Sequence, residues 1–482
     1  MRYIGLSIFL AGLAHPAVGQ SNTSLPGIVT EAGKPVAITH VIVVDGTGAA
    51  VRPDQTVIVK GSRIIASGPA GHIKIPKIAQ VIDGRGKSLI PGLVGMHEHM
   101  FYASPIAGPP IPIEQFVTAP RLYLASGVTT ARTAGSMDPY GDLELKRGID
   151  AGKMIGPDLT LSTPYLEGAV PAVPTMHALS GPDDARRLVR YWYDQGFRSV
   201  KAYADVSADE LAAGINEAHS LGLTVTGHLC SVGYKNAMSL GIDNFEHGPF
   251  VSPDGDLDRE RKPDLCRRLD GPQTGRAVLG HITTNVSPND AEVSDLIQQM
   301  VRQHVALTST LAVLEGGTDM SEKRRARLQA LLHPAVWTYL NEASPERAAR
   351  GALFLQAMRK EMAFERAFVK AGGLLMAGCD PTGDGFTLAG LGDQRNVELL
   401  VGAGFSVPDT IRIATLNGAK FDGKSDEIGS IEVGKRADLV LLNGDISRDV
   451  TAIEAPAIVF KAGVGFDSAT LYKSVTGQAG LH

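Results

Sequence analysis

The stretch at residues 88–102 reads SLIPGLVGMHEHMFY, and it decides how the rest of the chain is interpreted. An apolar run rich in strand-forming residues ends in His97 and His99, with Glu98 between them. Residues two apart in a strand share one face, so both imidazoles would stand on the same side and could hold one metal ion. The chain has 13 histidines and a close pair can also arise by chance, so this prediction depends on the other strands.

Eight apolar, β-rich runs alternate with helical patterns between residues 89 and 427. After the opening stretch they are GVTTARTAG at 127–135, GPDLTLST at 156–163, FRSVKAYAD at 197–205, GLTVTGHLC at 222–230, IDNFEHG at 242–248, HVALTSTL at 304–311 and GGLLMAGCD at 372–380. This alternation is typical of a (β/α)8 TIM barrel in the α/β class. A doubly wound open sheet fits less well, because no G-x-G-x-x-G turn follows a strand.

Short β-branched runs with turn signals lie on both sides of this region. Between residues 36 and 87, turns such as Asp45-Gly46 predict a small antiparallel unit, and the pattern returns at 429–467. Neither segment is large enough to form a core alone, so we expect both ends to pair into one small composite β-sandwich. The predicted domains are 20–88 and 428–482 for the sandwich and 89–427 for the barrel.

The first residues, MRYIGLSIFLAGLAHPAVGQ, have the pattern of a secretory signal peptide over residues 1–19. One arginine precedes an apolar stretch that is too short to span a bilayer comfortably, and small residues follow at 17–19. An uncleaved anchor is the alternative. We therefore expect a periplasmic or secreted protein with no membrane contact after signal cleavage.

The composition of the 482 residues narrows the class of partner. The chain is 44% hydrophobic and 20% charged with a net charge of −5, which gives no electrostatic reason to expect nucleic acid. A small-molecule or dipeptide substrate is favoured, and a homo-oligomer stays open. Three cysteines argue against a disulfide framework; Cys230 and Cys379 are expected to pack as small buried hydrophobes, with one bridged pair as the alternative.

Metal-capable residues recur where the predicted strands end. They are His97 and His99 in the first strand, Lys201 in the fourth, His228 in the fifth, His247 in the sixth and Asp380 in the eighth. Barrel enzymes place their active sites at these carboxyl ends. Each single histidine or aspartate has a structural explanation, but a lysine inside an apolar strand is costly unless it is paired or modified. Such residues on so many strand ends are not independent accidents.

These residues resemble the pattern of the amidohydrolase superfamily: HxH after strand one, lysine after four, histidine after five and six, and aspartate after eight. The stretches VIDGRGKSLIPGLVGMHEH and GSIEVGKRADLVLLNGD are also similar to family signatures. The resemblance implies that His97, His99 and Asp380 bind one divalent metal and that His228 and His247 bind a second. It further implies that Lys201 is an N6-carboxylysine that bridges the two ions.

The chemistry of this ligand set has its own physical logic. A lysine carbamate is anionic, so it can lie between two cations that an ammonium group would repel. Nitrogen and oxygen donors without thiolates suit zinc best, with manganese or cobalt as alternatives. A hydroxide bridging the ions would be the nucleophile, since zinc lowers the pKa of bound water to about 7. Asp380 could accept its proton and pass it to the leaving nitrogen.

The phrases GIDNFEHG, GVTTAR and VKAY resemble the imidazolonepropionase-like branch, which includes secreted Xaa-Pro dipeptidases and enzymes that split ochratoxin. The resemblance implies hydrolysis of the C–N amide bond of dipeptides or N-acyl amino acids, including ochratoxin-like amides. Tyr203 and Arg132 are the candidates for binding the substrate carboxylate, and a structural ion pair is the alternative for Arg132. Tyr102 and Tyr165 are candidate aromatic walls.

Two other activities on the same scaffold stay open. Lactone or ester hydrolysis uses the same nucleophile and Lewis acid. A cyclic-amide hydrolase or deaminase is the other, although deaminases of this superfamily commonly use a single metal without a bridging lysine, so Lys201 counts against them. A binding module without catalysis is disfavoured by the intact ligand set.

Overall fold

The structure is a computed structural model that describes residues 25–481 apart from 105–110, 172, 174, 253–256, 258–279, 281, 316–319, 343–344 and 383–385. The predicted signal peptide therefore lies outside the described residues. Most of the segment 252–290, which the sequence suggests as an excursion over the barrel mouth, also lies outside them. Among the described residues, no helix is both long and apolar enough to cross a membrane.

All eight strands expected between residues 89 and 427 are formed, and their neighbours pair in parallel. One sheet has the order β10-β9-β6, with β6 at Leu93–Glu98, β9 at Val128–Thr133 and β10 at Asp158–Thr160. A second sheet runs in chain order through β11 (Ser199–Ala202), β12 (Thr224–Gly227), β13 (Asn244–Glu246), β14 (Ala306–Ser309) and β15 (Leu375–Ala377). These strands are almost wholly buried, as expected for parallel strands covered by helices.

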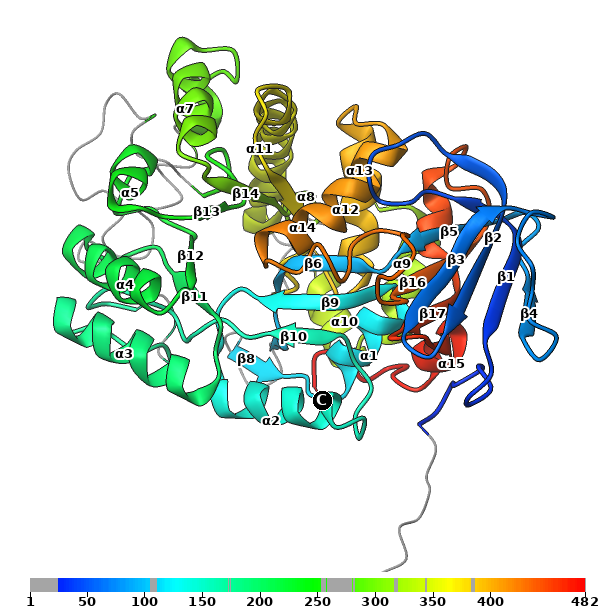
Figure 1. Ribbon diagram of the computed structural model, residues 1–482. Coiled ribbons are helices and arrows are strands. Elements are labelled where there is room, and N and C mark those ends of the chain that lie inside the picture. The colour runs from blue at the N-terminus through cyan, green and yellow to red at the C-terminus, as the bar shows by residue number, and fades with distance from the viewer. Residues whose placement is uncertain are drawn as a thin grey trace, which may run out of the picture.

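The two parallel sheets approach each other at both margins. A parallel bridge joins Ser162, just past β10, to Ser199 at the start of β11. On the other side, the backbone N–H of Asp380 donates to the carbonyl of His97 at 3.0 Å, so the chain after β15 lies beside the end of β6. The result is a TIM-barrel-like α/β fold (Figure 1).

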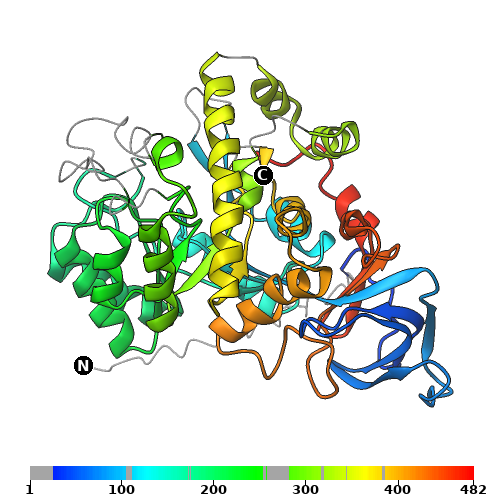
Figure 2. The same cartoon turned by 90° about the horizontal axis from the view of Figure 1, so that it is seen from above.

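Helices surround these strands (Figures 1 and 2). Among the described residues they include α1 (Thr118–Ala125), α2 (Pro139–Asp150), α3 (Pro182–Gln195), α4 (Ala208–Ser220), α5 (Tyr234–Leu240), α7 (Ala291–Arg302), α8 (Leu311–Leu314), α9 (Glu322–Leu331), α10 (Pro334–Asn341), α11 (Pro345–Lys370), α12 (Leu391–Gly402), α13 (Val407–Ile413), α14 (Leu416–Phe421) and α15 (Ser468–Lys473), with a short 3₁₀ helix at Val450–Glu454. Local signals set their ends: Ser207 and Glu210 form a capping box on α4, and left-handed Gly196 ends α3.

Strands from both ends of the chain pair in one further sheet, seen at the right of Figure 1. Its order is β18-β17-β16-β5-β1-β2-β3, and β4 pairs with β1. The strands are β1 (Val36–Val43), β2 (Arg52–Lys60), β3 (Arg63–Pro69), β4 (Gln80–Asp83), β5 (Lys87–Pro91), β16 (Leu439–Asn443), β17 (Pro456–Lys461) and β18 (Val464–Asp467). The two-layer sandwich and the domain bounds stay predictions.

The N-terminal part of this sheet is mixed, and the expectation of an antiparallel unit is wrong for two of its pairings. β1 pairs with β2 antiparallel but with β4 and β5 parallel. The connection after β3 is long enough for β4 and β5 to run in the same direction as β1, whereas a hairpin turn can join only antiparallel strands. A separate hairpin of β7 (Phe101–Ser104) and β8 (Ile111–Glu114) follows β6.

Candidate metal centre

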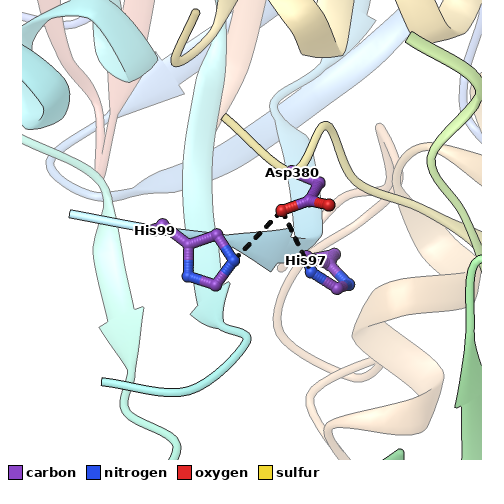
Figure 3. Close-up of side chains that lie close together, drawn as sticks. All are labelled: His97, His99 and Asp380. Atoms are coloured by element: carbon purple, nitrogen blue, oxygen red, sulfur yellow. Dashed lines mark ion pairs between the residues drawn. The ribbon is translucent and has the colours of Figure 1, made fainter. Parts of the chain in front are cut away.

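His97, His99 and Asp380 meet at the carboxyl ends of β6 and β15 (Figure 3). The Nε2 atoms of His97 and His99 lie 3.5 and 3.2 Å from Oδ1 of Asp380. Ligand atoms of all three residues lie within 4.8 Å of one another, which is the spacing that a shared ion requires. The histidines are almost fully buried, and Asp380 is the most accessible of the three.

The backbone brings Asp380 to this point through unusual conformations. Gly378 packs on the end of β6, where an added Cβ would lie only 2.4 Å from the backbone nitrogen of His97. Asp380 has a left-handed φ of 52°, and His247 has one of 68°. Non-glycine residues adopt this region uncommonly, and the surrounding structure must hold them there.

His228, His247 and Lys201 stand next to this group. The ring of His247 lies 4.5 Å from that of His97 and 4.6 Å from that of His228, and its Nε2 is 3.9 Å from Oδ2 of Asp380. The Nδ1 of His247 lies 2.6 Å from the hydroxyl of Thr310, which leaves Nε2 turned to the centre. The structure therefore places all six predicted ligands in one region.

Lys201 projects into this region with no hydrogen bond to Nζ among the described residues. Its side chain is almost completely buried. Burial lowers the pKa of the Lys201 amine to about 8, although the carboxylates of Glu246 and Asp380 act in the opposite direction. A buried amine without a hydrogen-bond partner is costly. This position therefore fits a lysine whose amine is modified, so that the modified group can bind a cation.

Burial and neighbouring charges favour the protonation states of metal ligands. Burial lowers the pKa of His228 to about 3 and that of His247 well below its usual range, so both imidazoles are neutral at pH 7. Burial raises the pKa of Asp380, but the adjacent His97 and His99 outweigh it and hold the pKa well below its ordinary value. Neutral imidazoles and an ionised carboxylate are the forms that bind divalent cations.

Glu246 is a further buried residue of this site that the sequence analysis did not single out. It ends β13, one residue before His247, and is fully buried. One carboxylate oxygen lies 2.7 Å from Nδ1 of His97, and the other accepts from Arg132 at 2.8 Å and from the hydroxyl of Thr226. A carboxylate on the far nitrogen orients a metal-binding histidine. The sequence signal that could have identified it is a glutamate inside an otherwise apolar strand, in NFEH at residues 244–247.

Arg132 lies beneath the site and is fully enclosed. Its guanidinium donates to the carbonyl of Met96 at 2.9 and 2.6 Å and to Glu246. These contacts correspond to the structural ion pair that was the alternative for this residue. Tyr203, by contrast, lies on the side of the metal-capable residues, with its ring 5.1 Å from that of His228 and 5.0 Å from that of Tyr165.

The cysteines divide into two kinds. Cys230 is buried as expected, but it is disulfide-bonded, which is the bridged alternative, whereas Cys379 is free and buried. The thiol of Cys379 donates to Glu98 at 3.0 Å, directly behind the histidine pair. Burial raises the pKa values of the Glu98 carboxyl and the Cys379 thiol well above their usual values.

The comparisons with known proteins agree with this geometry. Residues 88–465 match the family described as "Amidohydrolase family", so the chain belongs to that family. Two short segments resemble imidazolonepropionases: 38% identity over 64 residues for the protein of Stenotrophomonas maltophilia and 55% over 40 residues for that of Bacteroides thetaiotaomicron. These matches cover 13% and 8% of this chain and only 16% and 10% of those proteins.

Solved structures match over almost the whole chain. A putative prolidase from Bifidobacterium longum has 25% identity and a TM-score of 0.65, covering 92% of this chain and 99% of its own. A Xaa-Pro dipeptidase with bound methionine has 20% identity and a TM-score of 0.66 over 90% and 100%. The ochratoxinase of A. niger has 17% identity and a TM-score of 0.63 over 90% and 96%. The chain is thus similar in fold to hydrolases of this family.

Proposed function

We propose that this protein is a binuclear metal-dependent hydrolase that cleaves the C–N amide bond of dipeptides or N-acyl amino acids. The observation that carries the proposal is the meeting of six metal-capable side chains, from five strand ends, around Asp380. Family membership supports hydrolysis, and the prolidase and ochratoxinase similarities support an amide with an amino acid on its leaving side.

The residues fit two divalent ions. His97, His99 and Asp380 would hold one, His228 and His247 the other, and a carboxylated Lys201 would lie between them. The Lys201 amine would form this carbamate by attacking CO2 and losing a proton, and its lowered pKa makes the neutral amine accessible near pH 8. Nitrogen and oxygen donors favour zinc. When bound, such ions supply a hydroxide at neutral pH and a Lewis acid for the carbonyl.

The protein's own groups do the remaining work. Asp380 is ionised and partly accessible, so it can accept a proton from the attacking water and deliver it to the leaving nitrogen. Glu246 fixes the orientation of the His97 ring through Nδ1. The ring of Tyr203, beside His228, is positioned to orient a substrate at the edge of the centre.

We also propose that the chain is exported and that residues 1–19 are removed. The composition of this segment supports export. Expression of the full chain in a Gram-negative host, followed by mass determination of the periplasmic form, tests it. A mass corresponding to a start at Gln20 is expected, whereas an intact chain in the cytoplasm would contradict it.

Hydrolysis of a substrate panel tests the activity. The zinc-loaded protein is assayed with dipeptides, N-acyl amino acids, lactones and simple esters, with Asp380→Asn as the blank. We expect cleavage of dipeptides or N-acyl amino acids, and a loss of at least about a thousandfold in Asp380→Asn with the fold retained. Cleavage of lactones alone, or activity that persists in Asp380→Asn, would contradict the proposal.

A further inference from the structure

A pocket of about 480 Å³ lies between α3 and the loops that follow β9 and β10. Its volume is within the range of small-molecule sites, about 300–1,000 Å³. The ring of Tyr165 lines the pocket and lies 5.0 Å from the ring of Tyr203, which lies 5.1 Å from the ring of His228. Two packed rings therefore stand between the pocket and the metal-capable residues. The pocket is a separate cavity, and its ligand need not be the substrate.

Helix α3 forms one side of the pocket with residues at helical spacing. Arg187 and Tyr191 are four residues apart, and so are Leu188 and Trp192, while Asp184 precedes Leu188 by the same interval. Side chains three and four residues apart share one face of a helix. These five side chains therefore form a strip along the pocket. The strip is charged at its start and aromatic at its end, so it favours a ligand with one charged end and one apolar end.

Trp192 gives the apolar end of the strip a fixed aromatic surface. Its side chain is largely buried, and its ring centroid lies 5.0 Å from that of Tyr191 and 4.9 Å from that of Phe197. Edge-to-face contacts of this kind hold the indole in one orientation. Other apolar walls include Met137 and Met176, whose thioethers adapt to the shape of a ligand. This end of the pocket is suited to an uncharged aromatic ring.

Arg187 supplies a cation at the other end of the strip. Its side chain is 68% exposed, and within the described part of the chain its guanidinium makes one polar contact, from Nη2 to Asp184 at 3.2 Å. Asp184 also accepts from the backbone N–H and the hydroxyl of Ser180 and lies 3.0 Å from Nε2 of His177. A guanidinium has five N–H donors in a planar fork that matches a carboxylate. Arg187 can therefore bind a second carboxylate beside Asp184.

The separation of the two ends limits the length of the ligand. Arg187 and Trp192 are five residues apart on α3, which corresponds to about 7.5 Å along the helix axis. A carboxylate attached directly to a ring matches this separation poorly. A ring joined to its carboxylate through a short alkyl chain can contact both side chains at once.

We propose that this pocket is a second ligand site that binds an arylalkanoate, with its aromatic ring at Trp192 and its carboxylate paired with Arg187. The ligand is a free acid held away from the metal-capable residues, because the rings of Tyr165 and Tyr203 separate the two places. The inference does not depend on the proposed hydrolysis, since the pocket contains none of the metal-capable residues.

Fluorescence tests occupancy of the pocket directly, because the chain has two tryptophans, Trp192 and Trp337. In a Trp337→Phe background, Trp192 is the sole reporter. The protein as purified is titrated with 3-(4-nitrophenyl)propanoate, whose nitroaryl ring quenches indole emission on contact. The control ligand is 3-(4-nitrophenyl)propan-1-ol, which keeps the ring and the chain but has no charge. We expect saturable quenching by the acid, with an affinity at least tenfold higher than that of the alcohol.

Two matched variants locate the carboxylate. Arg187→Gln removes the cation of the pocket, whereas Arg186→Gln removes the neighbouring charge, which pairs with Asp183 on the surface and is not among the described residues that line the pocket. We expect Arg187→Gln to weaken binding of the acid at least tenfold and to leave binding of the alcohol unchanged. Arg186→Gln should change neither affinity.

Three results would overturn the inference: no saturable quenching of Trp192, equal affinities for the acid and the alcohol, or equal binding of the acid by Arg187→Gln and Arg186→Gln. Amide hydrolysis measured on the same preparation keeps the two proposals apart. A protein that binds the acid at Trp192 but hydrolyses no amide would refute the proposed function alone. A protein that hydrolyses amides without any response of Trp192 to the acid would refute the second ligand site alone.

Discussion

Glu246 lies between two other buried ionisable side chains of the site, His97 and Arg132. It contacts the His97 ring on one side and the Arg132 guanidinium on the other, and none of the three is exposed to water beyond a few per cent. Burial alone raises the pKa of Glu246, but His97, Lys201 and Arg132 hold it well below its usual value. A buried carboxylate that stays ionised in this way can fix the orientation of the side chains it contacts.

Glu246→Gln should therefore damage both stability and metal binding. The change leaves the Arg132 charge buried without its partner, for which the expected loss in free energy of unfolding is about 3–5 kcal/mol. Loss of the carboxylate behind His97 should also weaken zinc binding about 10- to 100-fold. Urea denaturation of the metal-free protein and zinc competition with a chelator measure the two effects.

The matched control for this variant is Glu217→Gln. Glu217 makes a surface ion pair with Arg190, whose side chain is half exposed, so its loss should cost less than about 1 kcal/mol and leave zinc binding unchanged. If Glu246→Gln behaved like this control, Glu246 would have no structural role at the centre.

Helix α11 supports the turn that follows β13. Its Glu361 is fully buried, and one carboxylate oxygen accepts from the backbone N–H of Phe250 at 3.1 Å. Gly248, next to His247, has a φ of 86°, and an added Cβ would lie 1.9 Å from the other oxygen of Glu361. A side chain at this position would therefore force the buried Glu361 carboxylate to shift.

Gly248→Ala should destabilise the protein through this collision. Overpacking costs about 1–3 kcal/mol, and the positive φ adds strain. Gly222→Ala is the matched control, because Gly222 has a φ of 70° but no atom within 4 Å of the added Cβ. Thermal unfolding should show a larger loss for Gly248→Ala; equal losses would mean that the contact with Glu361 has no effect.

Asp142 on α2 should make stability fall as the pH rises. Burial raises its pKa to about 7, with Asp138 adding to the rise and the Ser136 hydroxyl opposing it. The folded state then binds the proton more tightly than the unfolded state, whose pKa is near 3.9. Between these values the free energy of unfolding decreases with pH by up to about 1.4 kcal/mol per unit.

Asp142→Asn removes this titration, so the variant should gain stability relative to wild type at pH 8 and not at pH 4. Urea denaturation at the two pH values measures the difference. Asp183→Asn, at an exposed position of α3, makes the same charge change and is the control. An equal response of both variants to pH would contradict the assignment to Asp142.

The barrel strands were predictable because each is an apolar run bounded by turn residues and separated from the next by a helical pattern. The positions of His97, Lys201 and Asp380 followed from where those runs end. The parallel pairing of β1 with β5 was not predictable, because it depends on a long connection and not on a local turn. The ion pair between Arg132 and Glu246 was not predictable either, because the two residues are 114 apart in sequence and no local pattern links them.

At the scale of the whole molecule, the two ends of the chain depend on each other. β16 lies between β17 and β5, with Val440 opposite Ile90, and β5 leads directly into β6 and the histidine pair. Leu439 and Leu441 of β16 share a buried cluster with Val41, Val57 and other residues of the N-terminal strands. The C-terminal strands therefore cover the base from which the first barrel strand starts.

Removal of residues 428–482 should prevent cooperative folding of the remainder. The truncation exposes the edge of β5 and the apolar face that Leu439 and Leu441 cover, which favours aggregation. Soluble yield and the sharpness of thermal unfolding measure this, and addition of the 428–482 peptide in trans is the control. A soluble truncated chain with a sharp transition would contradict the dependence.

The most direct test of the central claim is the zinc content per chain, determined by elemental analysis after dialysis in bicarbonate buffer. The wild-type protein should retain about two zinc ions, as expected if carboxylated Lys201 bridges two adjacent sites. Lys201→Ala should retain at most one, while keeping its secondary structure. Two ions retained in Lys201→Ala, or no more than one in the wild type, would contradict a lysine-bridged binuclear centre.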